Sequence, residues 1–99
     1  MKYIKEFENN KKDLYVCNIS DNDLEYYYNR IIDMNLEYYY YKLVGDRNLI
    51  YVYVSPEERK NNFLGWHKVD DIVNSGDLYN LKEYIDMLKA KKEAEKYNL

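Results

Sequence analysis

Two apolar runs separated by a short turn constrain the fold of this chain more than any other feature. The first run is Leu36–Val44, with four consecutive tyrosines at 38–41, and the second is Leu49–Val54. Tyr, Val and Ile favour β-strands, and the intervening Gly45–Asn48 segment is rich in turn-forming residues. The pattern predicts an antiparallel β-hairpin.

A loop of even length centred on Asp46 and Arg47 sets the register that we expect, in which Leu43 faces Ile50 and Tyr40 faces Tyr53. Opposed residues of an antiparallel pair point to the same side. One face is then almost wholly apolar: Tyr39, Tyr41, Leu43, Ile50, Val52 and Val54. The other carries four tyrosines and one lysine: Tyr38, Tyr40, Lys42, Tyr51 and Tyr53. We assign the aliphatic face to the core, although an odd loop would exchange the faces of one strand.

Length and composition bound the remaining possibilities. The 99 residues predict a single domain over 1–99, and the 46% hydrophobic content is typical of a folded chain. The net charge of −3 argues against a broad basic field for duplex nucleic acid. We find no membrane-spanning run and no signal peptide, and one cysteine forms no internal disulfide, so an intracellular, reducing location is expected.

The amino-acid bias indicates a thermal origin. Fourteen residues are tyrosine, Thr and Gln are absent, and Lys and Glu are abundant. The Lys and Glu content and the missing Gln match the hyperthermophile trend, so we expect a thermostable protein. The many asparagines argue the other way, and AT-rich codons would explain part of the bias.

The first half of the chain predicts two strands and a helix. Met1–Lys12 fits either one turn of a helix or a short strand, and we favour the strand. A buried strand is expected at Leu14–Ile19, which is short and nearly unbroken. Ser20 is a helix N-cap with acids in the first turn, and Asn35 is a plausible stop. This helix should cover the aliphatic face of the hairpin, with a right-handed crossover if the flanking strands are parallel.

The second half begins with a strong helix start, with Ser55 at the N-cap, Pro56 at the first helical position and Glu58 at the third, which is the spacing of a capping box. A strand or ordered loop is expected to follow at Phe63–His67. Val69–Val73 is expected to form a helical turn closed by Gly76. Asp77 is expected to cap the last helix, whose apolar stripe is Leu78, Leu81, Tyr84, Ile85 and Leu88. Its final turns would project into solvent or pack on a partner through Ala90, Ala94 and Tyr97.

These elements predict a compact α+β domain. We expect a small mixed or antiparallel sheet of about three to five strands, helices mainly on one face and a long C-terminal helix.

Catalytic motifs are nearly absent, so we expect no enzyme, no cofactor and no metal site. The sequence has no Gly-rich phosphate loop, no paired-cysteine metal spacing and no nucleophile elbow. A Cys17-His67-Asp70 constellation is conceivable, but Cys17 lies in a buried-strand pattern, where cysteine is usually inert. The acids Asp70, Asp71 and Asp77 are better explained as helix-flanking residues than as cation ligands.

The tyrosine face, Tyr38, Tyr40, Lys42, Tyr51 and Tyr53, has three interpretations. It is covered by the rest of the chain, or it contacts a host or viral protein or a second copy, because exposed aromatic patches need partners. The third is a stacking platform for single-stranded nucleic acid, which the net charge disfavours. We favour protein binding as the function, with single-stranded nucleic-acid binding as the alternative.

In its overall character the chain resembles the small proteins of crenarchaeal filamentous viruses, the lipothrixviruses and rudiviruses. The resemblance covers the full length and rests on the Tyr38–Tyr41 run, the Lys/Glu/Asn/Tyr bias and the absence of Thr and Gln. It implies a viral accessory protein acting in the cytoplasm of a hyperthermophilic, acid-dwelling host, and it carries over no catalytic residues. A low-GC bacterial or phage source would also explain the bias. An aliphatic and tyrosyl core suits acid tolerance, because tyrosine stays neutral there.

Overall fold

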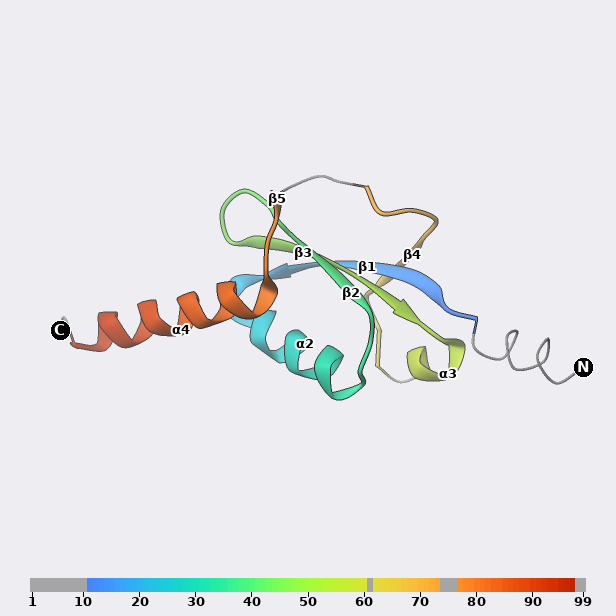
Figure 1. The fold of residues 1–99 in the computed structure, drawn as a ribbon, viewed down its shortest axis with the longest axis horizontal. Helices are drawn as coiled ribbons and strands as arrows, with labels where there is room; N and C mark the ends of the chain where they lie inside the picture. Colours follow the sequence, from blue (N-terminus) through green and yellow to red (C-terminus); the bar gives the residue numbers. More distant parts are fainter. Residues whose placement is uncertain (1–10, 61, 74–76, 98–99) are drawn as a thin grey trace, which may run out of the picture.

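The computed structural model describes residues 11–60, 62–73 and 77–97, and it shows an α+β domain (Figure 1). The strands are β1 (Asp13–Ser20), β2 (Tyr38–Lys42), β3 (Arg47–Val54), β4 (His67–Val69) and β5 (Asp77–Leu78). The helices are α2 (Asp21–Asp33), α3 (Pro56–Arg59) and α4 (Leu81–Tyr97). The described strands form one antiparallel sheet in the order β4-β1-β3-β2-β5, which confirms the predicted fold class. The strand expected within Met1–Lys12 lies almost wholly outside the described residues.

Helix α2 connects two strands that run in the same direction but are not neighbours. β1 and β2 both pair antiparallel with β3, which lies between them, so β1-α2-β2 is a split β-α-β unit. Ser20 occupies the predicted N-cap, and the helix ends before Asn35, whose φ of 54° is left-handed. Asparagine adopts this conformation more readily than most residues, which explains why the helix stops there.

The core lies between α2 and one face of the sheet (Figure 1). Leu24 and Ile31 of α2 belong to the same buried cluster as Ile50, Val52 and Val54 of β3, so the aliphatic side of β3 faces the core as predicted. Trp66 closes one side of this cluster, with its ring edge-to-face to Phe63 at 5.3 Å and to Tyr27 at 6.0 Å. Its buried Nε1 has no hydrogen-bond partner among the described residues.

The predicted register of the hairpin is wrong by three residues. Tyr40 pairs with Ile50 and Tyr38 with Val52, so these tyrosines share the core side of β3. Tyr40 is 1% exposed, whereas Tyr39, which was expected in the core, is 37% exposed. A shift by an odd number exchanges the two faces of one strand, and here β2 is the strand that turns over.

The hairpin turn explains the shift. The Leu43 amide donates to the Arg47 carbonyl at 3.0 Å, so the reversal uses the three residues 44–46 and not an even number. Gly45 has a φ of 73°, a backbone region that glycine enters without steric cost. Val44 was expected to pair with Leu49, but it lies in the turn with 94% of its surface exposed.

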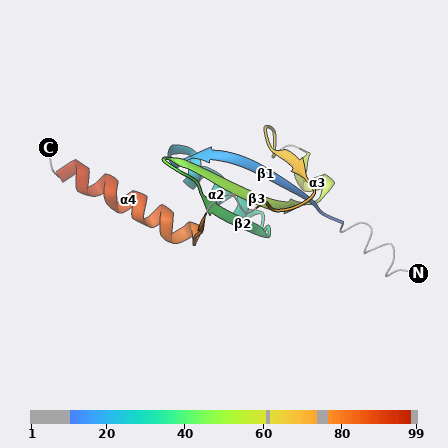
Figure 2. The same cartoon turned by 90° about the horizontal axis from the view of Figure 1, so that it is seen from above.

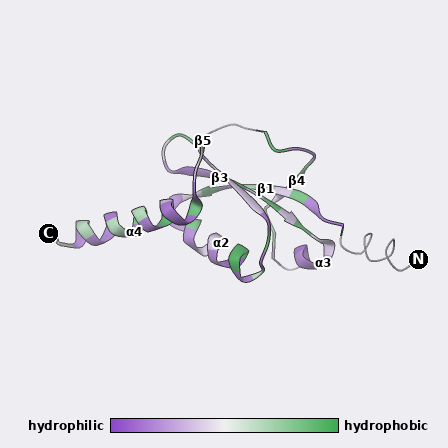
Figure 3. Cartoon of the chain, viewed as in Figure 1, coloured by the Kyte–Doolittle hydropathy of each residue, from purple (hydrophilic) through white to green (hydrophobic). Residues whose placement is uncertain are grey.

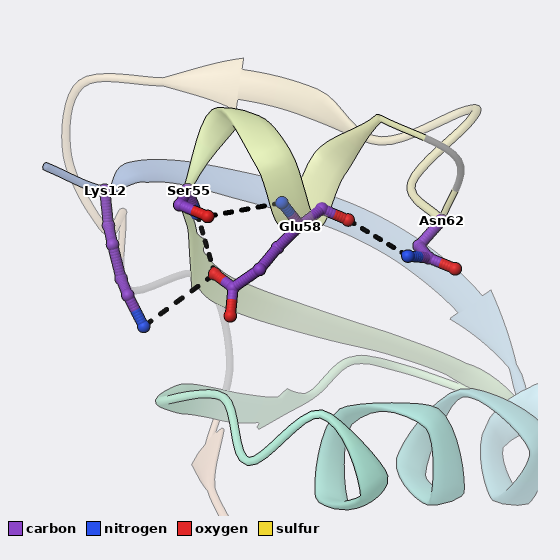
Figure 4. A network of polar contacts seen from close by, with 4 residues as sticks. All are labelled: Lys12, Ser55, Glu58 and Asn62. Atoms are coloured by element: carbon purple, nitrogen blue, oxygen red, sulfur yellow. Dashed lines mark hydrogen bonds and ion pairs between the residues drawn. The ribbon is translucent and has the colours of Figure 1, made fainter. Parts of the chain in front are cut away.

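The predicted capping box of α3 is confirmed (Figure 4). Ser55 Oγ accepts from the Glu58 amide at 3.2 Å, and the Ser55 amide donates to Glu58 Oε1 at 2.9 Å. Asn62 Nδ2 donates to the Glu58 carbonyl at 3.0 Å, and Lys12 Nζ lies 3.8 Å from Glu58 Oε1. These contacts hold the short helix at the end of β3.

Two expectations for the segment before α4 are wrong. Val69 ends β4, and residues 70–73 contain no helix, while the proposed closing residue Gly76 lies outside the described residues. Asp77 belongs to β5, and α4 starts at Leu81. The cap is Asn80, whose Oδ1 accepts from the Glu83 amide at 3.1 Å. Asparagine is as good an N-cap as aspartate, and pairing with β2 takes Asp77 into the sheet.

The observed register makes a testable distinction between neighbouring tyrosines. Tyr40→Ala should lower the free energy of unfolding by about 3–5 kcal/mol, the range for a large aromatic lost from a core. Tyr39→Ala should cost about 1 kcal/mol or less, because the side chain is partly exposed. Urea unfolding followed by circular dichroism measures both, and the reverse order of costs would support the register predicted from sequence.

Candidate functional site

The candidate contact surface predicted from the sequence is divided between the two faces of the sheet. Tyr38, Tyr40 and Lys42 lie on the side of α2, whereas Tyr51 and Tyr53 lie on the opposite side. The Tyr40 ring is in the core, so the structure does not bring these side chains together as one surface.

The face opposite α2 is partly covered by residues 70–73, which follow β4 and pass over it in Figure 1. The Tyr51 hydroxyl donates to the Val73 carbonyl at 3.0 Å and accepts from the Val73 amide at 3.1 Å. Tyr51 is consequently only 4% exposed. Tyr41 packs edge-to-face on Tyr51, and Tyr39 packs edge-to-face on Tyr53, with centroids 5.9 and 6.4 Å apart. These tyrosines therefore use much of their ring surface within the chain.

A buried polar network lies on the other side of the sheet, with Asn48 at its centre. The Asn48 side chain has no exposed surface. Its Oδ1 accepts from the Tyr40 hydroxyl, and its Nδ2 donates to the Ile19 carbonyl at 3.0 Å and to Asp21 Oδ1 at 2.8 Å. The network joins β1, β2, β3 and the first residue of α2.

The same network holds the start of α4. The Tyr84 hydroxyl lies 3.1 and 3.0 Å from the two carboxylate oxygens of Asp21, to which it donates. Burial, followed by the bond to Asp21, raises the pKa of Tyr84 to about 12. Burial, with the nearby Tyr84 and Asp21, also raises the pKa of Tyr40. Both hydroxyls are therefore held in the neutral, hydrogen-bond-donating form.

Lys42 stabilises the hairpin turn and is not a free cation for a ligand. Its Nζ donates to the carbonyls of Leu43, Gly45 and Arg47 at 3.0, 2.5 and 3.1 Å. The ammonium also lies 5.4 Å from the centroid of the Tyr84 ring. An ammonium has three N–H donors, so the turn carbonyls already occupy its hydrogen-bonding capacity.

A pocket of about 440 Å³ lies beside the start of α4. Its surface is mostly apolar, and the described residues that line it are Lys42, Tyr79, Asn80, Glu83, Tyr84 and Met87. Tyr79 and Met87 are 50% and 53% exposed, although both are large and apolar. Pockets of this volume accommodate small ligands or a side chain of a partner. We call this cavity the α4 pocket.

Beyond the pocket, α4 extends past the sheet in both views (Figures 1 and 2). Leu81 and Ile85 are buried against the core, and Leu88 is partly buried. Every residue from Lys89 to Lys96 is exposed. Apolar and polar residues both occur along this stretch (Figure 3). Ala90 and Ala94 are expected from the sequence to contact a partner, whereas Tyr79 and Met87 are not, because their exposure depends on where the helix leaves the sheet.

The structure does not bring together the Cys17, His67 and Asp70 side chains, and it shows no metal site among the described residues. Val16 pairs with His67 across β1 and β4, so the adjacent Cys17 points to the opposite face of the sheet. Cys17 packs against the core, and burial raises the pKa of its thiol. Within the described ranges 11–60, 62–73 and 77–97, no three His, Cys, Asp or Glu residues lie together as a metal site would require.

Comparison with known proteins found no matching family model, no similar curated sequence and no similar solved structure. Among the described residues, no helix is both long and apolar enough to cross a bilayer.

The tyrosine network predicts loss of stability in alkali. A group whose pKa is higher in the folded than in the unfolded protein stabilises the fold at pH values below its unfolded-state pKa. That contribution disappears as the pH rises through its folded-state pKa. For Tyr84 the window runs from 10.0 to about 12. Wild-type stability in urea should fall across this window, and Tyr84→Phe, which lacks the hydroxyl, should show a shallower fall. Equal pH dependence in the two proteins would contradict this assignment.

Proposed function

We propose that this protein acts by binding another protein through the α4 pocket and the exposed side of α4. The observation that carries the proposal is the position of Tyr79 and Met87, two half-exposed apolar side chains on the rim of one pocket. Exposed apolar groups that lie together mark contact sites more reliably than isolated ones.

The chemistry of the pocket supports a protein partner. Aromatic residues and methionine are enriched at the centres of protein interfaces, where a partner side chain fills a pocket. Tyr84 forms part of the lining, and its hydroxyl and ring are held by Asp21 and Lys42. A rigid wall of this kind loses little conformational entropy on binding.

Single-stranded nucleic acid is the weaker alternative. Stacking requires accessible ring faces, and of the candidate tyrosines Tyr40 is in the core and Tyr51 lies beneath Val73. Tyr53 is occupied edge-to-face by Tyr39. The net charge of −3 gives no general attraction for phosphates.

A viral accessory role in an archaeal host, implied by the sequence resemblance, belongs to the same proposal, as do stability to heat and acid and a place in the host cytoplasm. In that role the α4 pocket and the exposed side of α4 would be the contact surface.

A matched pair of substitutions tests protein binding. Met87→Glu places a charge at the pocket rim, and Leu64→Glu makes the same change at an exposed site on the turn before β4. The immobilised wild type should capture a protein from host lysate, and the affinity of that purified protein should fall at least about tenfold for Met87→Glu, as for an interface hot spot. Leu64→Glu should bind like the wild type. Equal binding by all three proteins would refute the proposed surface.

Acid tolerance has its own test. The ion pairs among the described residues have partly exposed side chains, as in Lys68 with Asp13 and Lys89 with Glu25. Exposed pairs contribute only about 0–1 kcal/mol each, so protonating their carboxylates should remove little stability. Asp21, which accepts hydrogen bonds from Asn48 and Tyr84, keeps oxygen acceptors for them when it is protonated. We expect the near-ultraviolet circular dichroism at pH 3 to match that at pH 7. Loss of the aromatic signal at pH 3 would show that the fold needs ionised carboxylates.

A further inference from the structure

The exposed side of α4 has the spacing of a helix-pairing surface. Met87, Ala90 and Ala94 recur at intervals of three and four residues, and Glu83 precedes them by four. All of these side chains are exposed. We call Met87, Ala90 and Ala94 the α4 seam. Alternation of three and four residues is the pattern of two helices packed along their length, and small side chains let the two axes approach closely.

The seam begins at the α4 pocket and is continuous with it. Glu83 and Met87 line the pocket, and Ala90 is the next seam residue along the helix. A helix that packs on the seam therefore also reaches the pocket and the exposed Tyr79. The combined surface includes two large apolar residues, Tyr79 from the connection before α4 and Met87 from the helix.

Charges beside the seam select the direction of the partner. The charges nearest the seam are Asp86 and Glu93 on one flank and Lys91 on the other. Farther from the seam, Lys82 pairs with Asp86 within the helix at 3.6 Å. When two identical helices pair in parallel, the acidic flank of each faces the basic flank of the other. In an antiparallel pair the flanks meet their own kind, so Lys91 would face another lysine. The charges that border the seam are thus complementary to those of a second copy in the parallel arrangement.

We propose that the partner on the α4 seam is a second copy of this chain, with the two α4 helices packed parallel and in register. The inference rests on the proposed function, because a second copy would use the same α4 surface that we propose for another protein, and the two would compete for it. Asp86 of each copy lies near Lys91 of the other, once on each side of a twofold axis along the helices. The two α4 pockets then face each other, and the exposed Tyr79 and Met87 become covered. Such an interface uses the same patch on both copies, as twofold symmetry requires.

Solution mass by light scattering, over a concentration series from micromolar to millimolar, tests the dimer. We expect the wild type to pass from monomer to dimer, and Met87→Glu to weaken the association at least tenfold. Lys91→Glu should weaken it as well, whereas Lys92→Glu, which makes the same charge change on the side of α4 that faces away from the seam, should leave it unchanged. The double variant Asp86→Lys/Lys91→Glu should regain most of the wild-type association, because it restores opposite charges across the interface.

Direction is tested by disulfide trapping in a Cys17→Ser background. Met87→Cys and Ala94→Cys, each alone, should form a symmetric disulfide under mild oxidation, because a parallel dimer brings identical positions together. Mixing the two variants should give little of the mixed disulfide. A predominantly mixed disulfide would show an antiparallel pair and overturn the proposed geometry.

The possible failures are distinguishable. A wild type that remains monomeric at every concentration, or a dimer indifferent to both Met87→Glu and Lys91→Glu, would overturn self-association through α4. Neither result decides the broader function, because the capture experiment with Met87→Glu and Leu64→Glu tests a different protein on the same surface. Far-ultraviolet circular dichroism of each variant confirms that the exposed substitutions leave the fold intact.

Discussion

The rest of the structure depends on the hydrogen bonds of one buried side chain, the amide of Asn48, which connect β1, β2 and β3 to the start of α2. Asn48 has no exposed surface, and its side chain bonds to Tyr40 on β2, to the Ile19 carbonyl on β1 and to Asp21 at the start of α2. A buried polar group without partners costs about 1–3 kcal/mol, so another register of the hairpin would be penalised at this position. The register in turn decides which tyrosines of β2 enter the core. The same Asp21 receives Tyr84, so α4 is held through the same network.

Local signals in the sequence were sufficient to predict most helices and strands, but not to predict how the strands pair. Ser55 and Glu58 form the predicted capping box, because its partners are three residues apart in the chain. The predicted hairpin register was wrong, because the polarity of the residues between the strands does not distinguish a three-residue turn from a longer one. Val44 reads as part of a strand, yet it is 94% exposed, since the Lys42 ammonium and the left-handed Gly45 stabilise a tighter reversal. One apolar residue in a turn was enough to exchange the faces of β2.

The candidate site depends on tertiary placement that the sequence pattern does not contain. Asp77 looked like the cap of the last helix, but pairing of β5 with β2 delays the helix to Leu81 and leaves Tyr79 at the rim of a pocket. Met87 lies outside the buried stripe of α4, so the sequence pattern does not mark it. Its place in the pocket lining becomes visible only in the folded structure. The four-tyrosine run places Tyr38 and Tyr40 at the core and packs Tyr39 and Tyr41 on the opposite face of the sheet.

The buried Trp66 has a consequence for how this protein would be followed spectroscopically. It is the only tryptophan of the chain, and its indole lies against Phe63 and Tyr27 with an N–H that has no partner in the described structure. Its emission therefore reports the packing of α2 against the turn before β4. The exposed turns of α4 contribute to far-ultraviolet ellipticity but do not surround this indole. Fraying of those turns would separate the two optical transitions without any folding intermediate, so coincidence of the probes is too strict a criterion for two-state behaviour in this molecule.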